Sequence, residues 1–312
     1  MRVKIARHGP GRVPLSIIFY NSTVLVNLNY FFMRDRNLVD GENRRWEDVP
    51  VVHPESFTRE FAEWCLEHGV KGKYSIVPCP AALGRIDEGL PLFSRAQQES
   101  WLAMCKEVIV PNYDITPEMI THTRVLDLST GRPLEPASAA TMENSWPQQK
   151  KSVDELAGYL AYALRILKNC GLPCEGVTTP GGFGNLVKPE LSLAAGEALR
   201  DVYSVELPHY FKYVAGGRDE NTEPRIEHVS GLKTANARAV VNVPAGTGDW
   251  FGGWDGDLKS RGQLYSNDDA TAGRMVELIE RGSPAVMLCH WPGMYSCLLY
   301  TSPSPRDGLL SR

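Results

Sequence analysis

Short apolar runs alternate with amphipathic helical patterns along most of this chain, and this alternation restricts its fold more than any other feature. Each apolar run has the length of a buried strand, and each helical pattern places apolar residues on one face. Strands are expected at 13–21, 72–80, 117–123, 174–179, 209–214, 237–245 and 284–290. Helices are expected at 53–69, 94–110, 152–171, 188–205 and 270–283.

Strand–helix alternation is typical of a mostly parallel sheet with covering helices. With about seven such units, the sequence favours an α/β fold built as an irregular or incomplete (β/α) barrel of about seven strands, in a single domain over residues 1–296. An open parallel sheet is the alternative. In either case the connecting loops converge at the carboxyl ends of the strands, where we expect the site.

The last residues, 297–312, are predicted to be non-native. CLLYTSPSPRD at 297–307 matches the in-frame translation of a transposon-end sequencing adapter, and GLLSR at 308–312 agrees with the index and constant bases that follow it. A Pro/Ser-rich tail is the alternative, but it does not explain a match over so many consecutive codons. We therefore expect a metagenomic-type fragment whose catalytic-type domain, residues 1–296, is truncated at its C-terminus.

Charge and composition exclude several partner classes. The net charge of −4 is too small to indicate nucleic acid or an anionic membrane surface. No apolar run approaches transmembrane length. The cysteines lie mostly within apolar or amphipathic runs, as reduced core thiols do, so we expect a cytoplasmic protein. The oligomeric state is left open.

Polar and aromatic residues follow almost every predicted strand. These strand-end residues are Tyr20, Asn21, His122, Pro180, Asp249, Trp250, His290 and Trp291, and the loop after the second strand carries Asp87 and Glu88. Hydrogen-bonding groups beside stacking faces suit a carbohydrate, either a small sugar or an oligosaccharide. Tyr20, Asn21, Pro180, Trp250 and Trp291 are therefore the candidate substrate-binding residues.

The ionisable candidates each have a second interpretation. A single His after an apolar strand is often a structural residue, but the Trp291-Pro292-Gly293 turn expected after His290 favours an exposed, functional ring. Asp87 and Glu88 are solvated loop charges or members of a carboxylate pair. Asp249 belongs to a Gly-rich turn, or to a site that the permissive backbone exposes.

The motifs THT at 121–123, TTPGGFG at 178–184 and VMLCH at 286–290 resemble, in this order, the polysaccharide deacetylases (the NodB-like family). The resemblance implies an irregular (β/α) barrel and a divalent metal such as Zn²⁺, held by one Asp and two His, that activates water. It assigns His290 the role of general acid and His122 that of a metal ligand.

This sequence departs from the family pattern at three points. Tyr20 and Asn21 replace the paired aspartates, Leu126 stands where the second metal-binding His is expected, and Thr178 replaces an Arg. The metal ligand set is thus incomplete.

Three functions follow from these residues. The first is a carbohydrate-active hydrolase, polysaccharide deacetylase-like, with a cleft at the carboxyl ends of the strands. The second is a glycoside hydrolase that uses Asp87 or Glu88 with Asp249, a pair that needs a separation of about 5–10 Å. The third is a non-catalytic sugar-binding barrel that has lost its metal site. The catalytic candidates are therefore His290, Asp249, Glu88 and Asp87.

Overall fold

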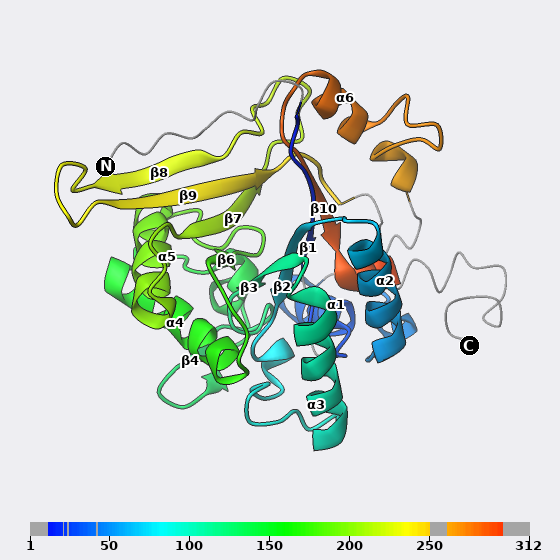
Figure 1. Ribbon diagram of the computed structural model, residues 1–312. Helices are drawn as coiled ribbons and strands as arrows, with labels where there is room; N and C mark the ends of the chain where they lie inside the picture. The colour runs from blue at the N-terminus through cyan, green and yellow to red at the C-terminus, as the bar shows by residue number, and fades with distance from the viewer. Residues whose placement is uncertain (1–11, 21, 24, 42, 250–260, 296–312) are drawn as a thin grey trace.

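Two four-stranded sheets form the centre of the computed structural model, which describes residues 12–295 except 21, 24, 42 and 250–260 (Figure 1). The first sheet is parallel, in the order β10-β1-β2-β3. Its strands are β1 (Leu15–Tyr20), β2 (Gly72–Ile76), β3 (Tyr113–Pro117) and β10 (Ala285–His290). The second has the order β6-β7-β9-β8, with only β8 antiparallel. Its strands are β6 (Gly176–Thr178), β7 (His209–Val214), β8 (Arg225–Ser230) and β9 (Arg238–Ala245).

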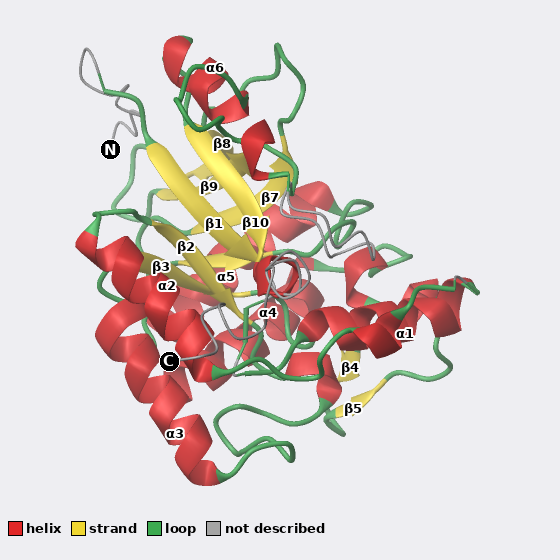
Figure 2. Ribbon diagram, turned by 90° about the vertical axis from the view of Figure 1, so that its right-hand side faces the viewer, coloured by secondary structure: helices red, strands yellow, loops and turns green. Residues whose placement is uncertain are grey.

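The two sheets meet along both of their flanks, and Figure 2 shows the strands of the second sheet behind those of the first. On one flank, a parallel bridge between Glu118 and Thr178 joins the end of β3 to β6. On the other, the amide of Gly246, just after β9, donates to the carbonyl of Val286 in β10 (2.7 Å). The prediction of a mixed α/β fold with a parallel sheet is therefore confirmed.

Helices cover the outer faces of these sheets. The α-helices are α1 (Leu28–Asp40), α2 (Glu55–Glu67), α3 (Arg95–Met104), α4 (Val153–Asn169), α5 (Lys188–Tyr203) and α6 (Arg274–Glu280). A π-helical segment, Cys105–Ile109, continues α3. Short 3-10 helices lie at Trp46–Asp48, Pro80–Ala82, Ala139–Thr141, Glu143–Ser145 and Gly262–Leu264, and the hairpin β4 (Leu126–Asp127) and β5 (Arg132–Pro133) lies before α4.

The helix α4 forms where the sequence predicts it. Its capping box is complete: the amide of Glu155 donates to Ser152 Oγ (3.2 Å) and the amide of Ser152 donates to Glu155 Oε2 (2.9 Å). These contacts satisfy two backbone donors that the helix itself leaves unpaired. Together α4 and α5 cover one side of the molecule, and α2 and α3 cover the other (Figure 1).

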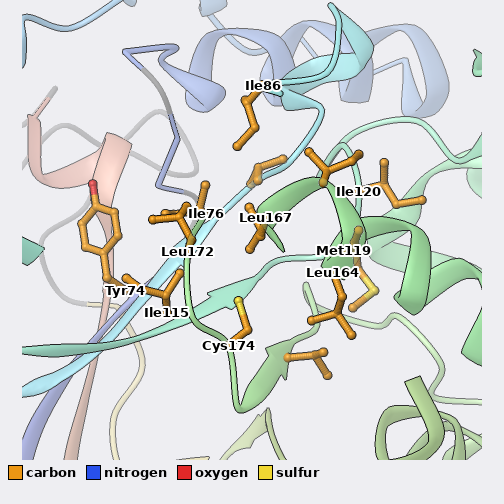
Figure 3. Close-up of a cluster of buried hydrophobic side chains, with 14 of the residues drawn as sticks. Tyr74, Ile76, Ile86, Ile115, Met119, Ile120, Leu164, Leu167, Leu172 and Cys174 are labelled. Carbon is orange, nitrogen blue, oxygen red and sulfur yellow. The ribbon is translucent and has the colours of Figure 1, made fainter. Parts of the chain in front are cut away.

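Alternate side chains along the strands enter two different cores. Outward-facing residues such as Tyr74, Ile76 and Ile115 belong to the same apolar cluster as Leu164 and Leu167 of α4 (Figure 3). Inward-facing residues form a smaller apolar cluster: Ile18, Tyr20, Phe211, Ala245, Val286 and Leu288. Because side chains alternate along a strand, the polar residues that share the inner face are held at fixed heights. The six described cysteines are all buried and free, as predicted.

Two local predictions are wrong. The expected strand at 117–123 is instead an irregular turn after β3, in which Met119 and His122 adopt left-handed backbone conformations (φ 52° and 61°) that a strand excludes. The expected exposed turn at Trp291 is helical at residues 291–295, and Trp291 is 1% exposed because Phe19, Phe57 and Tyr74 surround its ring. Neither α1 nor β8 was predicted from the sequence.

Candidate functional site

A histidine and an aspartate meet at the carboxyl ends of β9 and β10. His290 is the last residue of β10, and its Nδ1 lies 2.7 Å from Oδ2 of Asp249, which follows β9. The side chain of His290 keeps 16% of its surface exposed, and that of Asp249 keeps 9%. A carboxylate that accepts a hydrogen bond from Nδ1–H orients the imidazole and stabilises its protonated form. Both residues were predicted as candidates, and the structure brings them together.

Tyr20 lies directly beside this pair. It is paired with His290 in the register of β1 and β10, and the two rings meet edge to face with centroids 5.9 Å apart. Burial, and secondly the nearby charge of Glu118, raises the pKa of Tyr20 well above its ordinary range. The phenol is therefore a hydrogen-bond donor at neutral pH and is unsuited to act as a base.

A buried lysine lies below Tyr20, one layer deeper in the interior. Lys73 projects from β2, is 1% exposed, and donates from Nζ to the carbonyl of Phe19 (3.0 Å). The same Nζ lies 3.7 Å from the centroid of the Tyr20 ring and 5.2 Å from that of Phe211. Burial lowers the pKa of Lys73 to about 7, against the attraction of Glu118 and Asp114.

A second group of polar residues, centred on Glu118, lies on the β2–β3 side of the same region. Glu118 follows β3 and is fully buried; Ser75 Oγ lies 2.7 Å from its Oε2, and Nε2 of His122 lies 3.2 Å from its Oε1. Ser75 Oγ is also 2.9 Å from the carbonyl oxygen of Phe19, which Lys73 shares. One continuous polar region therefore joins the residues of both sides: Asp249, His290, Tyr20, Lys73, Ser75, Glu118 and His122.

The turn that carries Glu118 and His122 is held by a distant carboxylate. Glu143 is fully buried and accepts the amides of Ile120 (3.2 Å), Thr121 (3.0 and 3.1 Å) and His122 (2.6 Å). The hydroxyl of Tyr159 on α4 donates to the same carboxylate. Successive amides that point at one anion form a nest, which stabilises otherwise strained backbone. Burial nevertheless outweighs these donors and raises the pKa of Glu143 to about 7.

Asp87 and Glu88 lie elsewhere. Asp87 is ion-paired with Arg85 (2.7 Å) and accepts from Nδ2 of Asn169 (2.7 Å), the last residue of α4. Asn169 precedes the amino end of β6, whereas Asp249 follows the carboxyl end of β9. Since β6 and β9 run in the same direction, Asn169 and Asp249 lie at opposite ends of the sheet. Glu88 is 65% exposed and pairs with the same arginine. The structure therefore does not bring either carboxylate to Asp249.

The remaining predicted site residues divide into two groups. Pro180 is buried in the loop after β6, where Lys212 holds the neighbouring carbonyls of Gly181 (3.3 Å) and Phe183 (2.6 Å). The ring of Trp291 is buried in the larger apolar cluster, which also contains Tyr74, and does not face solvent. Asn21 and Trp250, together with the tail 297–312, lie outside the described residues.

The donor set was compared with the metal site that the resemblance implies. Within the described residues, no three His, Cys, Asp or Glu side chains converge as a metal site requires. His122 has Glu118 beside its ring, while Leu126, at the position of the expected second His, starts β4 and is buried. Tyr20 adds no carboxylate. These residues do not fit a three-ligand divalent metal.

The predicted site residues did not include Lys73, Ser75, Glu118 or Glu143. The available signals were two polar residues that alternate within an otherwise apolar strand, and a Glu four positions before His122. Comparison with protein-family models and with curated proteins found no match for this chain. Within the described part of the chain, every helix is too short or too polar to cross a membrane.

Proposed function

We propose that this chain is a carbohydrate-active hydrolase, polysaccharide deacetylase-like, in which His290 transfers the proton and Asp249 orients its ring. The observation that carries the proposal is the 2.7 Å contact between His290 Nδ1 and Asp249 Oδ2 at the carboxyl ends of neighbouring strands, with His290 partly exposed. An oriented imidazole at such a position is suited to general acid–base catalysis near neutral pH.

We further propose that the strands form an irregular (β/α) barrel of about seven strands. The order β10-β1-β2-β3 would continue through the Glu118–Thr178 bridge to β6-β7-β9. The hydrogen bond from Gly246 to Val286 would then return the circle to β10. In this arrangement the carboxyl ends of all these strands face one mouth, which explains why Tyr20, Glu118, Asp249 and His290 share one region.

The proposed reaction is hydrolysis of an acetyl group on a sugar. His290 takes a proton from a water molecule, whose oxygen attacks the acetyl carbonyl carbon. The protonated Tyr20 hydroxyl donates a hydrogen bond to the oxyanion that forms. When the C–N or C–O bond breaks, His290 returns the proton to the leaving amine or alcohol, and acetate is released. Because the described residues do not fit a metal, no step is assigned to one.

Acetate release tests this function. Acetylated amino-sugar oligosaccharides and acetylated xylo-oligosaccharides should release acetate with the wild-type chain, both with EDTA and with added Zn²⁺. His290→Gln and Asp249→Asn should lower kcat by roughly 10²- to 10⁴-fold, the usual contribution of a general acid–base. Glu88→Gln, an exposed carboxylate remote from the pair, is the control and should leave the rate unchanged. Equal activity of His290→Gln and the wild type would refute the assignment.

A sugar-binding barrel without turnover is the second candidate, favoured by Tyr20 in place of a carboxylate and by the incomplete metal ligand set. It predicts a ligand-dependent increase in Tm without acetate or reducing-end release. The glycosidase alternative loses support, because Asp87 and Glu88 lie away from Asp249. The proposed ligand in either case is a small carbohydrate or an oligosaccharide, and the proposed compartment is the cytoplasm.

A further inference from the structure

A lysine side chain lies buried in the interior, beneath the proposed site. Lys73 occupies a strand position whose neighbours on the inner face include Ile18 and Phe211, and it is 1% exposed. Burying an ammonium group costs several kcal/mol even after the protein relaxes. Among the described residues, no carboxylate lies within ion-pair distance of Nζ to offset this cost. An apolar side chain of similar length would stabilise the same position better.

The contacts of Lys73 point to the site above it. Its hydrogen bond goes to the carbonyl of Phe19, which fixes the ammonium against the backbone just before Tyr20. From there Nζ lies 3.7 Å from the centroid of the Tyr20 ring, close enough for a strong cation–π contact in a desolvated setting. On the other flanking strand, β10, the ring of His290 lies with its centroid 5.9 Å from that of Tyr20. Tyr20 is therefore held between Lys73 and the proton-transfer pair.

We propose that Lys73 is a positioning residue that acts through Tyr20. Its ammonium group fixes the Tyr20 ring beside His290. It also favours the negative charge that the ring gains when the Tyr20 hydroxyl donates a hydrogen bond to an oxyanion. This inference rests on the proposed function. The phenol gains electron density only as the oxyanion forms, so the interaction strengthens in the transition state and should affect kcat more than KM. Tyr20 would thus act as a hydrogen-bond donor at the position where the polysaccharide deacetylases have an aspartate.

The kinetic test is a double-mutant cycle. Lys73→Met should lower kcat by roughly 10- to 30-fold, the value of a desolvated cation–π contact, with KM changed less than about twofold. In a Tyr20→Phe background the same change should have little further effect, because the two residues act as one unit. Lys168→Met is the control: Lys168 binds the carbonyl of Val202 and lies 5.6 Å from the Tyr203 ring, remote from the site. Additive losses in the double variant would overturn the proposal.

A second readout does not depend on finding a substrate. With ¹³Cζ-labelled tyrosine, the resonance of Tyr20, assigned with Tyr20→Phe, should shift with a midpoint near pH 7 as Lys73 loses its proton. The titratable groups near Tyr20 and Lys73 in the described chain include Glu118 and Asp114 on the β3 side, His209 of β7, which pairs with Asp114, and His290 with Asp249. The titration is therefore repeated in His290→Gln and in His209→Gln. The step should persist there and disappear in Lys73→Met. Loss of the step in His290→Gln would refute the inference, whereas a persistent step without turnover would refute only the proposed function.

Discussion

Replacing Glu143 by Gln tests how the turn at 118–123 is held. The carboxylate accepts three successive backbone amides and the hydroxyl of Tyr159. At pH 5 Glu143 is protonated and its oxygens still accept, but in Gln one oxygen becomes an NH₂ group, which cannot accept and must face at least one of these donors. An unsatisfied buried donor costs about 1–3 kcal/mol, and the strained backbone of His122 loses part of its support. We therefore expect Glu143→Gln to be less stable than the wild type by about 1–3 kcal/mol at pH 5.

The difference should shrink as the pH rises. The pKa of Glu143 is about 7 in the folded chain, above its ordinary value of 4.5, because burial disfavours the charged form more than the donors favour it. A raised folded-state pKa gives stability that is fully present below pH 4.5 and is lost as the pH rises toward 7. For this shift the loss is about 3 kcal/mol. The amide of the Glu143→Gln variant cannot ionise, so the variant lacks this loss.

Urea unfolding followed by circular dichroism at pH 5, 6 and 7 measures this difference for both proteins. Tyr159→Phe is the matched control, since it removes one donor and leaves all the amide contacts of the carboxylate in place. A gap between wild type and Glu143→Gln that stays constant or widens from pH 5 to 7 would refute the reasoning. It would mean that the amide donors outweigh burial and that Glu143 is ionised throughout this range.

Three further predictions concern single positions in the fold. The pKa of Lys73 is about 7 in the folded state, below its ordinary value of 10.5. Its deprotonation should therefore raise the free energy of unfolding by about 2 kcal/mol between pH 7 and 9. Urea unfolding should show that Lys73→Met lacks this contribution. Gly176→Ala should destabilise by about 1–3 kcal/mol, because its Cβ would lie 2.3 Å from Nε2 of His209. Gly158→Ala in α4 meets no atom within 4 Å and should raise Tm, as replacing a helical Gly gains about 1 kcal/mol. An unchanged Tm for Gly176→Ala would contradict the packing argument.

Local patterns in the sequence were enough to predict most of the fold. Apolar runs and caps such as Ser152 with Glu155 act within a few residues, so β1, β2, β7, β9, β10 and α4 lie where they were expected. β8 was missed because its sequence, RIEHVS, alternates charge with single apolar residues at the edge of a sheet, where few side chains are buried. The turn after β3 was missed because Glu143, more than twenty positions later, imposes its left-handed conformations.

The candidate site could be predicted only in part, for a related reason. Strand ends identified His290 and Asp249 separately, but their contact joins residues 41 positions apart and depends on how β9 meets β10. Lys73 was hidden because a charge within an apolar strand gives no sign of which face it takes. Asp87 illustrates the opposite case: Arg85, two residues away, neutralises it in a local ion pair that its sequence spacing already permits.

Two of the buried ionisable groups near the site, Glu143 and Lys73, have opposite effects on the pH dependence of stability. Glu143 reduces stability as the pH rises from 4.5 to 7, and Lys73 increases it above pH 7. Their sum has a minimum near pH 7. A sequence selected for stability alone would replace Lys73 by an apolar residue of similar size, whereas Glu143 is needed to hold the turn at 118–123. That a buried lysine remains beneath Tyr20 argues that this end of the sheet is organised for chemistry or binding rather than for stability. In the double variant Glu143→Gln, Lys73→Met, the fall in stability from pH 5 to 7 and the rise from pH 7 to 9 should therefore each become smaller by about 2 kcal/mol, and Lys212, whose pKa burial also lowers to about 7, should account for part of the remaining rise. A profile identical to that of the wild type would refute both assignments.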